Sequence, residues 1–217
     1  LAVDVAFWRV LEAQGVVPWM VAGHSLGEFA ALVAANALDF VDALRLVRAR
    51  ARAMQEAVPA GEGAMVAVLG MDAEALRELC AAEDRAPDHR VCVAVWNAPQ
   101  SHVISGHREA VEAVATKLAG VRRVKTVALA VSGPFHSPLL DGAGRALQEV
   151  LAAVVVRPLR CPYVPNVTAQ PTTDGGDTLG ERLVAQVSSP VRWQQSLQSI
   201  IDAGATHILH AGPGNMV

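Results

Sequence analysis

Residues 20–38, which read MVAGHSLGEFAALVAANAL, contain the stretch that decides the fold. Residues 20–22 form a short apolar run that fits a strand, and residues 26–38 have the apolar spacing of a helix. Between them lies Gly-His-Ser-Leu-Gly, a G-x-S-x-G motif that is typical of a nucleophile elbow. The motif predicts that Ser25 is a nucleophile, exposed at a tight turn, and that the N–H of Leu26 helps to hold an oxyanion. The alternative is a glycine-rich turn that happens to carry a serine.

Downstream of the elbow, the apolar periodicity predicts a helix over residues 40–58 and then a compact series of elements. These are strands over 63–70, 91–98, 102–106 and 124–132, and helices over 72–82, with Asp72 as N-cap, and 108–118. The order β-α-β-β-α-β is that of a split βαβ, ferredoxin-like unit. We therefore expect an α/β fold in which an α/β-hydrolase-like core (residues 1–60 and 133–217) carries an inserted ferredoxin-like subdomain (residues 61–132).

The remaining elements complete the core. We expect helices over residues 138–153, 179–187 and 193–203, a proline-rich extended stretch over 158–171 and a last strand over 206–211. The chain opens directly in an amphipathic helix with one apolar side made of Val3, Phe7, Val10 and Leu11, and it stops just after a Gly-Pro-Gly turn. We interpret it as a fragment of a longer protein.

Composition excludes several classes of protein. Of 217 residues, 52% are hydrophobic and 18% charged, which excludes a disordered chain. The net charge of −3 leaves no footprint for nucleic acid, and no apolar run is long enough for a membrane span. The three cysteines are far apart and lack C-x-x-C spacing, so they suit a reducing cytoplasm and argue against a zinc site.

A serine nucleophile needs a base, and seven histidines are candidates. His136 stands out because it follows Ser-Gly-Pro-Phe, a turn just after a predicted strand, where a side chain can point into a cleft. No acid stands out as its partner, since Asp141 falls on the next predicted helix. A backbone carbonyl or an amide is the alternative partner for the imidazole.

The helix predicted over residues 40–58 carries four arginines. Its spacing predicts one apolar stripe, made of Val41, Leu44, Val47, Ala51, Met54 and Val58. Arg48 and Arg50 flank this stripe on opposite sides, and Arg45 and Arg52 point away from it. An arginine at the margin of a buried stripe can bind a carboxylate through two parallel hydrogen bonds, but helical geometry does not choose between Arg48 and Arg50.

Together these motifs carry a resemblance over essentially the whole chain. GHSLGE (23–28), RLVRARARAMQEAVP (45–59), NAPQSHVISG (97–106), VSGPFHSPLL (131–140), SSPVRW (188–193) and AGPG (211–214) are similar, in this order, to the malonyl-CoA:acyl carrier protein transacylase family. That family includes discrete enzymes of fatty acid synthesis and acyltransferase domains of polyketide synthases.

The resemblance implies roles for individual residues. Ser25 and His136 match the nucleophile and base, Arg50 the arginine that pairs with the extender's carboxylate, and Leu26 one oxyanion donor. Gln186 matches the residue whose backbone carbonyl orients the histidine, and His24, Asn97 and Phe135 fall in the substrate site. The family's second oxyanion donor belongs to an N-terminal G-Q-G motif that this sequence does not contain.

The implied activity is transfer of a malonyl group from malonyl-CoA to the phosphopantetheine thiol of an acyl carrier protein. It passes through an acyl-serine and needs no metal or redox cofactor. Phe135 favours malonate, and the alternatives are a branched extender such as methylmalonyl-CoA, a serine thioester hydrolase, or a non-catalytic scaffold domain. Glu28 and the inserted unit count against a hydrolase. Arg122 and Arg123 either contact an acidic carrier protein or form a solvated face. The sequence is compatible both with a free-standing enzyme and with a piece of a multidomain synthase.

Overall fold

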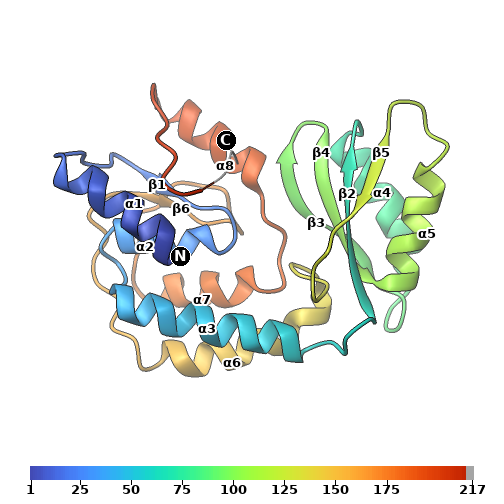
Figure 1. Cartoon of the computed structure of the whole chain (residues 1–217), viewed down its shortest axis with the longest axis horizontal. Helices are drawn as coiled ribbons and strands as arrows, with labels where there is room; N and C mark the ends of the chain where they lie inside the picture. Colours follow the sequence, from blue (N-terminus) through green and yellow to red (C-terminus); the bar gives the residue numbers. More distant parts are fainter. Residues whose placement is uncertain (214–217) are drawn as a thin grey trace.

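Strands β1 (Val21–Ala22) and β6 (Tyr163–Val164) lie side by side in parallel, with Val21 opposite Tyr163 and Ala22 opposite Val164. The structure is a computed structural model and describes residues 1–213. This short parallel pair lies at the centre of the larger of two parts of the molecule (Figure 1). Because the carboxyl ends of both strands face the same edge, the loops that follow them converge there.

Helices surround the strand pair in the larger part. They are α1 (Ala2–Ala13), α2 (Gly27–Ala34), α3 (Phe40–Glu56), α6 (Asp141–Leu151), which a 3₁₀ turn at Pro138–Leu140 precedes, α7 (Asp177–Gln186) and α8 (Trp193–Asp202). Helix α3 runs along α6, and their apolar sides meet in one core (Figure 1). Its fully buried members include Phe29, Leu32, Leu46, Leu147, Tyr163 and Leu183.

The smaller part is a sheet with two helices on one face (Figure 1). Its elements follow the expected β-α-β-β-α-β order: β2 (Gly63–Leu69), α4 (Ala73–Glu83), β3 (Val91–Ala98), β4 (Ser101–His107), α5 (Arg108–Leu118) and β5 (Lys125–Ala128). The strands pair antiparallel in the order β3-β4-β2-β5. Asp72 caps α4, as predicted, because its Oδ1 accepts the Glu74 N–H over 2.9 Å. The helices bury Leu76, Val111 and Leu118 against Ile104 of the sheet.

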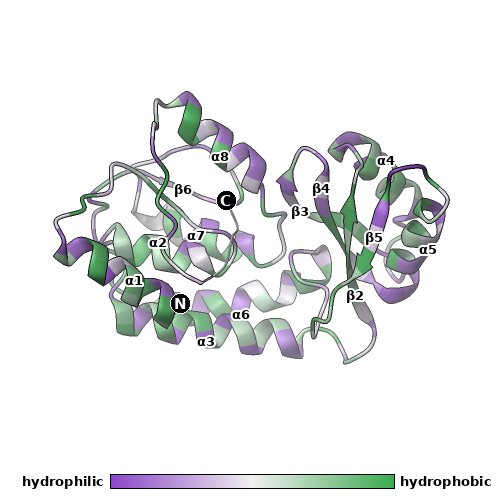
Figure 2. Cartoon of the chain, turned by 45° about the horizontal axis from the view of Figure 1, so that its top comes forward, coloured by the Kyte–Doolittle hydropathy of each residue, from purple (hydrophilic) through white to green (hydrophobic). Residues whose placement is uncertain are grey.

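The other face of this sheet contacts the larger part. Val95 of β3 forms a bridge with Val191, and the Trp96 N–H donates to the Val191 carbonyl over 2.9 Å. A separate apolar cluster fills this junction, and half-buried Phe135 packs against both it and the core of the larger part. Hydrophobic residues, green in Figure 2, occur on the small sheet as well as on the surrounding helices.

Three predicted elements differ in the structure. Residues 206–211 form no strand, because no described strand pairs with them, and Ile208 and Leu209 remain 45% and 65% exposed. The strand predicted over 124–132 is shortened to β5, and the helix predicted over 138–153 begins with the 3₁₀ turn. The predicted Gly-Pro-Gly turn ends at residue 214, outside the described residues.

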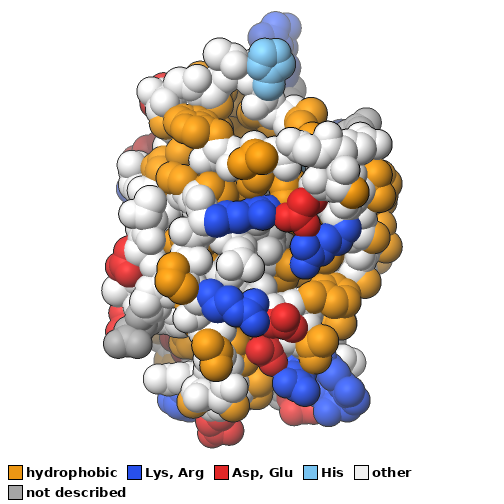
Figure 3. All heavy atoms as spheres, turned by 90° about the vertical axis from the view of Figure 1, so that its left-hand side faces the viewer, with side chains coloured by type: hydrophobic (Ala, Val, Ile, Leu, Met, Phe, Trp, Pro, Cys, Tyr) orange, Lys and Arg blue, Asp and Glu red, His pale blue; other side chains and the backbone are white. Residues whose placement is uncertain are grey.

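The buried faces of two helices also differ from the prediction. Helix α1 buries Val5 and Trp8, whereas Val3, Phe7 and Val10 are exposed. The end of the molecule that carries α1 shows hydrophobic side chains next to acidic and basic ones (Figure 3). Helix α3 buries Ala43, Leu46, Arg50 and Met54, which places Arg50 within the buried face rather than at its margin. No helix in the described part of the chain is long and apolar enough to cross a membrane.

Candidate active site

The predicted elbow forms between β1 and α2. Ser25 has a φ of +51°, a left-handed conformation that is strained for a residue with a side chain. Only a glycine fits at position 23, since an added Cβ would lie 2.0 Å from the Gly27 carbonyl oxygen. Gly27 itself has open space around its missing side chain, so of the two motif glycines only Gly23 is required sterically. The turn therefore allows α2 to begin directly after Ser25.

His136 is the histidine that the structure brings to Ser25. Its Nε2 lies 2.7 Å from Ser25 Oγ. Its Nδ1 faces two backbone carbonyl oxygens, that of Gln186 at 3.0 Å and that of Ser189 at 3.2 Å. Carbonyl oxygens only accept, so the Nδ1 carries the proton and the Nε2 accepts the Ser25 hydroxyl. The Gln186 carbonyl thus lies at the ring nitrogen where the resemblance placed it, whereas the contact of the Ser189 carbonyl was missed.

The surroundings of His136 keep its imidazole neutral. The side chain is buried, and its φ of +58° is again left-handed. Burial, and next the charge of Arg50, lower the pKa of His136 to about 3, although the two carbonyl acceptors oppose this shift. A neutral imidazole with a free Nε2 lone pair is the form that a general base requires.

Arg50 resolves the choice that helical geometry left open. It is only 6% exposed, and its Nη2 donates to Ser25 Oγ over 3.1 Å. Arg48 is exposed on the other side of α3, as are Arg45 and Arg52. Burial lowers the pKa of Arg50 to about 10, and the charge of Glu28 opposes that shift, so the guanidinium is positive at neutral pH. A cation is therefore held directly at the candidate nucleophile.

Asn166 was missed by sequence reasoning. Its fully buried amide spans the elbow, because Oδ1 accepts the Ser25 N–H over 2.7 Å and Nδ2 donates to the Gly23 carbonyl over 2.7 Å. The residue follows β6 just as the elbow follows β1, at the carboxyl ends of paired parallel strands. An asparagine shortly after the apolar Tyr-Val pair at 163–164 was the available signal, but pairing of the two short strands was not predicted.

The side chain of Gln186 adds contacts that its predicted role did not include. Its Nε2 donates to the Ser25 carbonyl over 3.0 Å and to Glu28 Oε2 over 2.7 Å. Glu28 Oε2 also accepts the Asn166 N–H over 3.1 Å. Glu28, Asn166 and Gln186 thus form a buried polar network beneath the elbow.

The other predicted site residues lie around this centre. His24 Nε2 is 2.9 Å from Asn97 Oδ1, and the His24 ring meets the Trp193 ring edge-on at 5.5 Å. Burial lowers the pKa of His24, which favours its neutral form. Phe135 is the half-buried residue directly before His136. Leu26 begins α2 as its N-cap, and no described residue accepts a hydrogen bond from its N–H.

The remaining histidines have other partners or lie in other places. His102 is buried in the small sheet and His107 Nδ1 accepts the Arg90 N–H, while His89 lies near Glu83 and His207 and His210 are exposed. Asp141 is exposed at the start of α6, as expected. Within residues 1–213, no group of three or more His, Cys, Asp or Glu side chains is placed to hold a metal ion.

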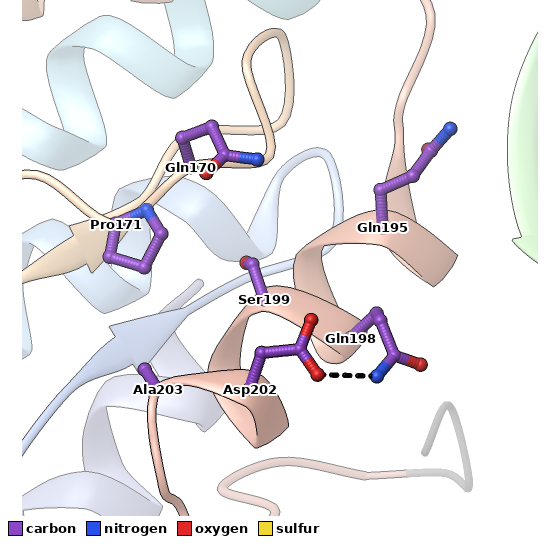
Figure 4. Close-up of a pocket in the computed structure, with 7 residues that line it drawn as sticks. All are labelled: Gln170, Pro171, Gln195, Gln198, Ser199, Asp202 and Ala203. Carbon is purple, nitrogen blue, oxygen red and sulfur yellow. Dashed lines mark hydrogen bonds between the residues drawn. The ribbon is translucent and has the colours of Figure 1, made fainter.

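A separate hollow of about 500 Å³ lies between α8 and residues 170–171, in the loop that joins β6 to α7. Its lining consists of Gln170, Pro171, Gln195, Gln198, Ser199, Asp202 and Ala203, and Gln198 donates to Asp202 Oδ1 over 2.8 Å (Figure 4). None of the residues around Ser25 lines this hollow. The hollow is therefore separate from the Ser25 site.

The acyl transferase domain family matches residues 1–213. The chain belongs to this family.

Several relatives of the chain are malonyl transacylases by name. The chain is 43% identical over 220 residues to the malonyl CoA-acyl carrier protein transacylase of Bacillus subtilis strain 168, covering 100% of this chain and 68% of that protein. It resembles the crystal structure of the malonyl-CoA:acyl carrier protein transacylase from Xanthomonas oryzae pv. oryzae with a TM-score of 0.92 and 42% identity, covering 98% of this chain and 67% of that one. It also resembles a malonyl-transacylase in complex with a type II PKS acyl-carrier protein, with a TM-score of 0.90, 39% identity and coverage of 98% and 68%.

Proposed function

We propose that this acyltransferase moves a malonyl group from malonyl-CoA to the phosphopantetheine thiol of an acyl carrier protein through an acyl-Ser25 intermediate. One observation carries the proposal: Ser25 Oγ lies 2.7 Å from His136 Nε2 and 3.1 Å from Arg50 Nη2. Nucleophile, neutral base and buried cation thus meet at one atom. A carboxylated acyl thioester supplies the electrophile and the anion that these three groups fit, and the relatives are malonyl transferases by name.

The first half-reaction acylates the serine. Ser25 Oγ attacks the thioester carbonyl while its proton passes to His136 Nε2, and the Leu26 N–H donates to the developing oxyanion. The tetrahedral intermediate collapses with cleavage of the carbon–sulfur bond, and the CoA thiolate takes the proton from His136. The Gln186 and Ser189 carbonyls stabilise the imidazolium that forms in between.

The second half-reaction reverses these roles. His136 Nε2 removes the proton of the carrier protein's pantetheine thiol, the sulfur attacks the malonyl ester, and the proton returns to Ser25 Oγ as the ester bond breaks. Arg50 pairs with the free carboxylate of the malonyl group, which selects a carboxylated substrate and holds the ester in place. His24, Asn97 and Phe135 line the acyl position. This acyl transfer between oxygen and sulfur uses no metal or redox cofactor.

The proposed architecture serves this chemistry. Within the described residues, 1–60 and 133–213 form an α/β-hydrolase-like core, for which the parallel β1–β6 pair and the elbow are the support. Residues 61–132 form a ferredoxin-like subdomain, supported by the β-α-β-β-α-β order and the β3-β4-β2-β5 sheet. The carrier protein is the proposed partner, either of a discrete enzyme or within a multidomain synthase. The three unpaired cysteines support a cytoplasmic location.

Mass spectrometry of the protein after incubation with malonyl-CoA tests the proposal. A malonyl adduct on the peptide that contains Ser25, lost on addition of holo acyl carrier protein, is the expected result. The lifetime of the adduct in water separates a transferase from a hydrolase. The proposal fails if no adduct forms or if water removes it as fast as the carrier protein does.

A further inference from the structure

A buried carboxylate lies beneath the elbow and has no part in the steps above. Glu28 follows Gly27 on α2 and is 0% exposed. Its Oε2 accepts two hydrogen bonds, one from the Asn166 N–H over 3.1 Å and one from Gln186 Nε2 over 2.7 Å. A carboxyl group is costly to bury, and this one is directed at two polar residues that both belong to the site.

Each of the two donors holds a reacting group. The Gln186 carbonyl accepts the Nδ1–H of His136 over 3.0 Å, and the Gln186 amide also donates to the Ser25 carbonyl over 3.0 Å. The Asn166 amide holds the Ser25 N–H and the Gly23 carbonyl, both over 2.7 Å. One carboxylate oxygen therefore connects the backbone on both sides of the nucleophile with the acceptor that orients the base.

Such support is needed because both reacting residues have left-handed backbones. Ser25 has a φ of +51° and His136 a φ of +58°, and residues with side chains keep such conformations only when their surroundings hold them. The Ser25 and His136 side chains must also stay within 2.7 Å of each other, although they come from distant parts of the chain. A displacement of about 1 Å in such a pair costs on the order of 100-fold in rate.

We propose that Glu28 is a positioning residue for the acylation of Ser25, acting through Gln186 and Asn166 to hold Ser25 Oγ and His136 Nε2 in register. The proposal deepens the proposed function and rests on it only in taking Ser25 and His136 as the reacting pair. It does not depend on the identity of the acyl group.

The test compares Glu28→Ala with Glu28→Gln. The amide oxygen of glutamine can accept from both Asn166 and Gln186, whereas alanine removes the acceptor. Glu181→Gln is the matched control, because Glu181 is exposed on α7, the helix that also carries Gln186. The first readout is the rate at which a fluorophosphonate labels Ser25. In this reaction Ser25 Oγ bonds to phosphorus, fluoride leaves and His136 takes the proton, so neither CoA nor a carboxylate is needed.

We expect Glu28→Ala to slow labelling by about 100-fold and to lower kcat for malonyl loading by a similar factor, with little change in KM for malonyl-CoA. Glu28→Gln should recover most of both losses, and Glu181→Gln should match the wild type. Gln186→Ala should also slow labelling, because it removes one of the two donors but keeps the carbonyl that faces His136. In the double variant, the loss of labelling rate should be smaller than the losses of Gln186→Ala and Glu28→Ala combined, because both act through the same hydrogen bond.

Thermal unfolding of each variant separates positioning from loss of the fold. The proposal is overturned if folded Glu28→Ala is labelled at the wild-type rate, or if Glu28→Gln loses as much as Glu28→Ala. If Glu28→Ala does not fold, Gln186→Ala decides, and an unchanged labelling rate there overturns the proposal. Wild-type protein that is labelled by the fluorophosphonate but not loaded by malonyl-CoA would overturn the proposed function alone.

Discussion

Arg50 Nη2 donates to Ser25 Oγ over 3.1 Å, which places a buried positive charge directly on the candidate nucleophile. The guanidinium lies over the Phe29 ring at 6.0 Å, and the nearby carboxylate that most favours its charge is Glu28. Because the pair of Arg50 and Ser25 is formed before any substrate is bound, an incoming carboxylate meets an oriented cation rather than a mobile one. In the proposed function, the position of Arg50 would therefore link selection of the acyl group to the oxygen that attacks it.

Removal of this cation should change which acyl group is loaded. In Arg50→Ala, we expect malonyl loading to fall roughly 10–150-fold, since a hydrogen bond to a charged group contributes about 1.5–3 kcal/mol. Loading from acetyl-CoA should rise relative to malonyl loading. Competition between the two thioesters, followed by mass spectrometry of the Ser25 peptide, measures the ratio. Arg48→Ala is the matched control on the same helix, and the assignment is wrong if Arg48→Ala alone changes the ratio.

The nucleophile and its base should differ in what their loss costs. Ser25→Ala removes the atom that bonds to the acyl group, so no adduct should form. His136→Ala leaves that atom but removes the base, and loading should slow by several orders of magnitude. Single-turnover loading with malonyl-CoA measures both. Transfer of malonate by Ser25→Ala at a measurable rate would contradict the assignment of the nucleophile.

The nucleophile and its base could be predicted from local sequence because both lie next to strong local signals, whereas Gln186, His24, Asn97 and Phe135 came from the resemblance to the family. Ser25 lies in a strand–turn–helix motif, and His136 follows a turn after a strand. The choice of Arg50 over Arg48 depended on which face of α3 is buried, and the apolar spacing gave a stripe that included Val41 and Leu44, both exposed in the structure. The true face includes Arg50 itself, so a hydrophobic pattern cannot find it. Resemblance to the family supplied that choice.

Asn166, which was missed, and the strand predicted over residues 206–211, which does not form, show what local sequence cannot predict. Asn166 contacts the elbow because two strands of two residues each pair in parallel, and no local pattern announces a pairing between such short, distant segments. Residues 206–211 were predicted as a strand, but a strand needs a partner, and none of the described strands provides one. In both cases the structure depends on whether two segments that are distant in the sequence pair with each other.

The pH dependence of stability should report the burial of Glu28. Burial raises the pKa of Glu28 to about 7 from an ordinary value of 4.5, against hydrogen bonds from Gln186 and Asn166 and the charges of Arg50 and Arg182. The Glu28 charge in turn acts to raise the pKa values of Tyr163 and Arg50, although burial is the largest cause of the shift in both. Between pH 4.5 and about 7, Glu28 binds more protons in the folded state than in the unfolded state. The contribution of Glu28 protonation to stability is therefore complete below pH 4.5 and is lost as the pH rises through about 7.

Glu28→Gln removes this titration. The free energy of unfolding of the wild type, minus that of Glu28→Gln, should therefore decrease as the pH rises from about 4.5 to 7. Urea unfolding at steps of pH measures the difference. A difference that is constant over this range, or that increases, would show that the Glu28 pKa is not raised in the folded protein.

The two glycines of the elbow motif should respond oppositely to alanine. In Gly23→Ala the new Cβ would lie 2.0 Å from the Gly27 carbonyl oxygen, so the backbone must shift, and we expect a loss of about 3 kcal/mol in stability together with loss of Ser25 acylation. Gly27→Ala meets open space at the start of α2 and should be neutral or stabilising by up to about 1 kcal/mol. Chemical denaturation compares the two. Equal destabilisation by both variants would contradict the steric argument.

Phe135 should limit the size of the acyl group. The residue lies directly before His136 and is half-buried where the core of the larger part meets the junction with the small sheet. In the proposed function, we expect the phenyl ring to occupy the space that the α-methyl group of methylmalonate needs. One methyl group is worth about 1–3 kcal/mol in an apolar pocket, so the wild type should prefer malonyl-CoA over methylmalonyl-CoA by roughly 10–200-fold. Phe135→Ser should reduce that preference, and competition between the two thioesters measures it before and after the substitution.

Loading of both thioesters by the wild type at equal rates would refute the preference for malonyl-CoA. An unchanged ratio in Phe135→Ser, in a variant that remains folded, would mean that Phe135 packs the core beside His136 and that another residue selects the extender.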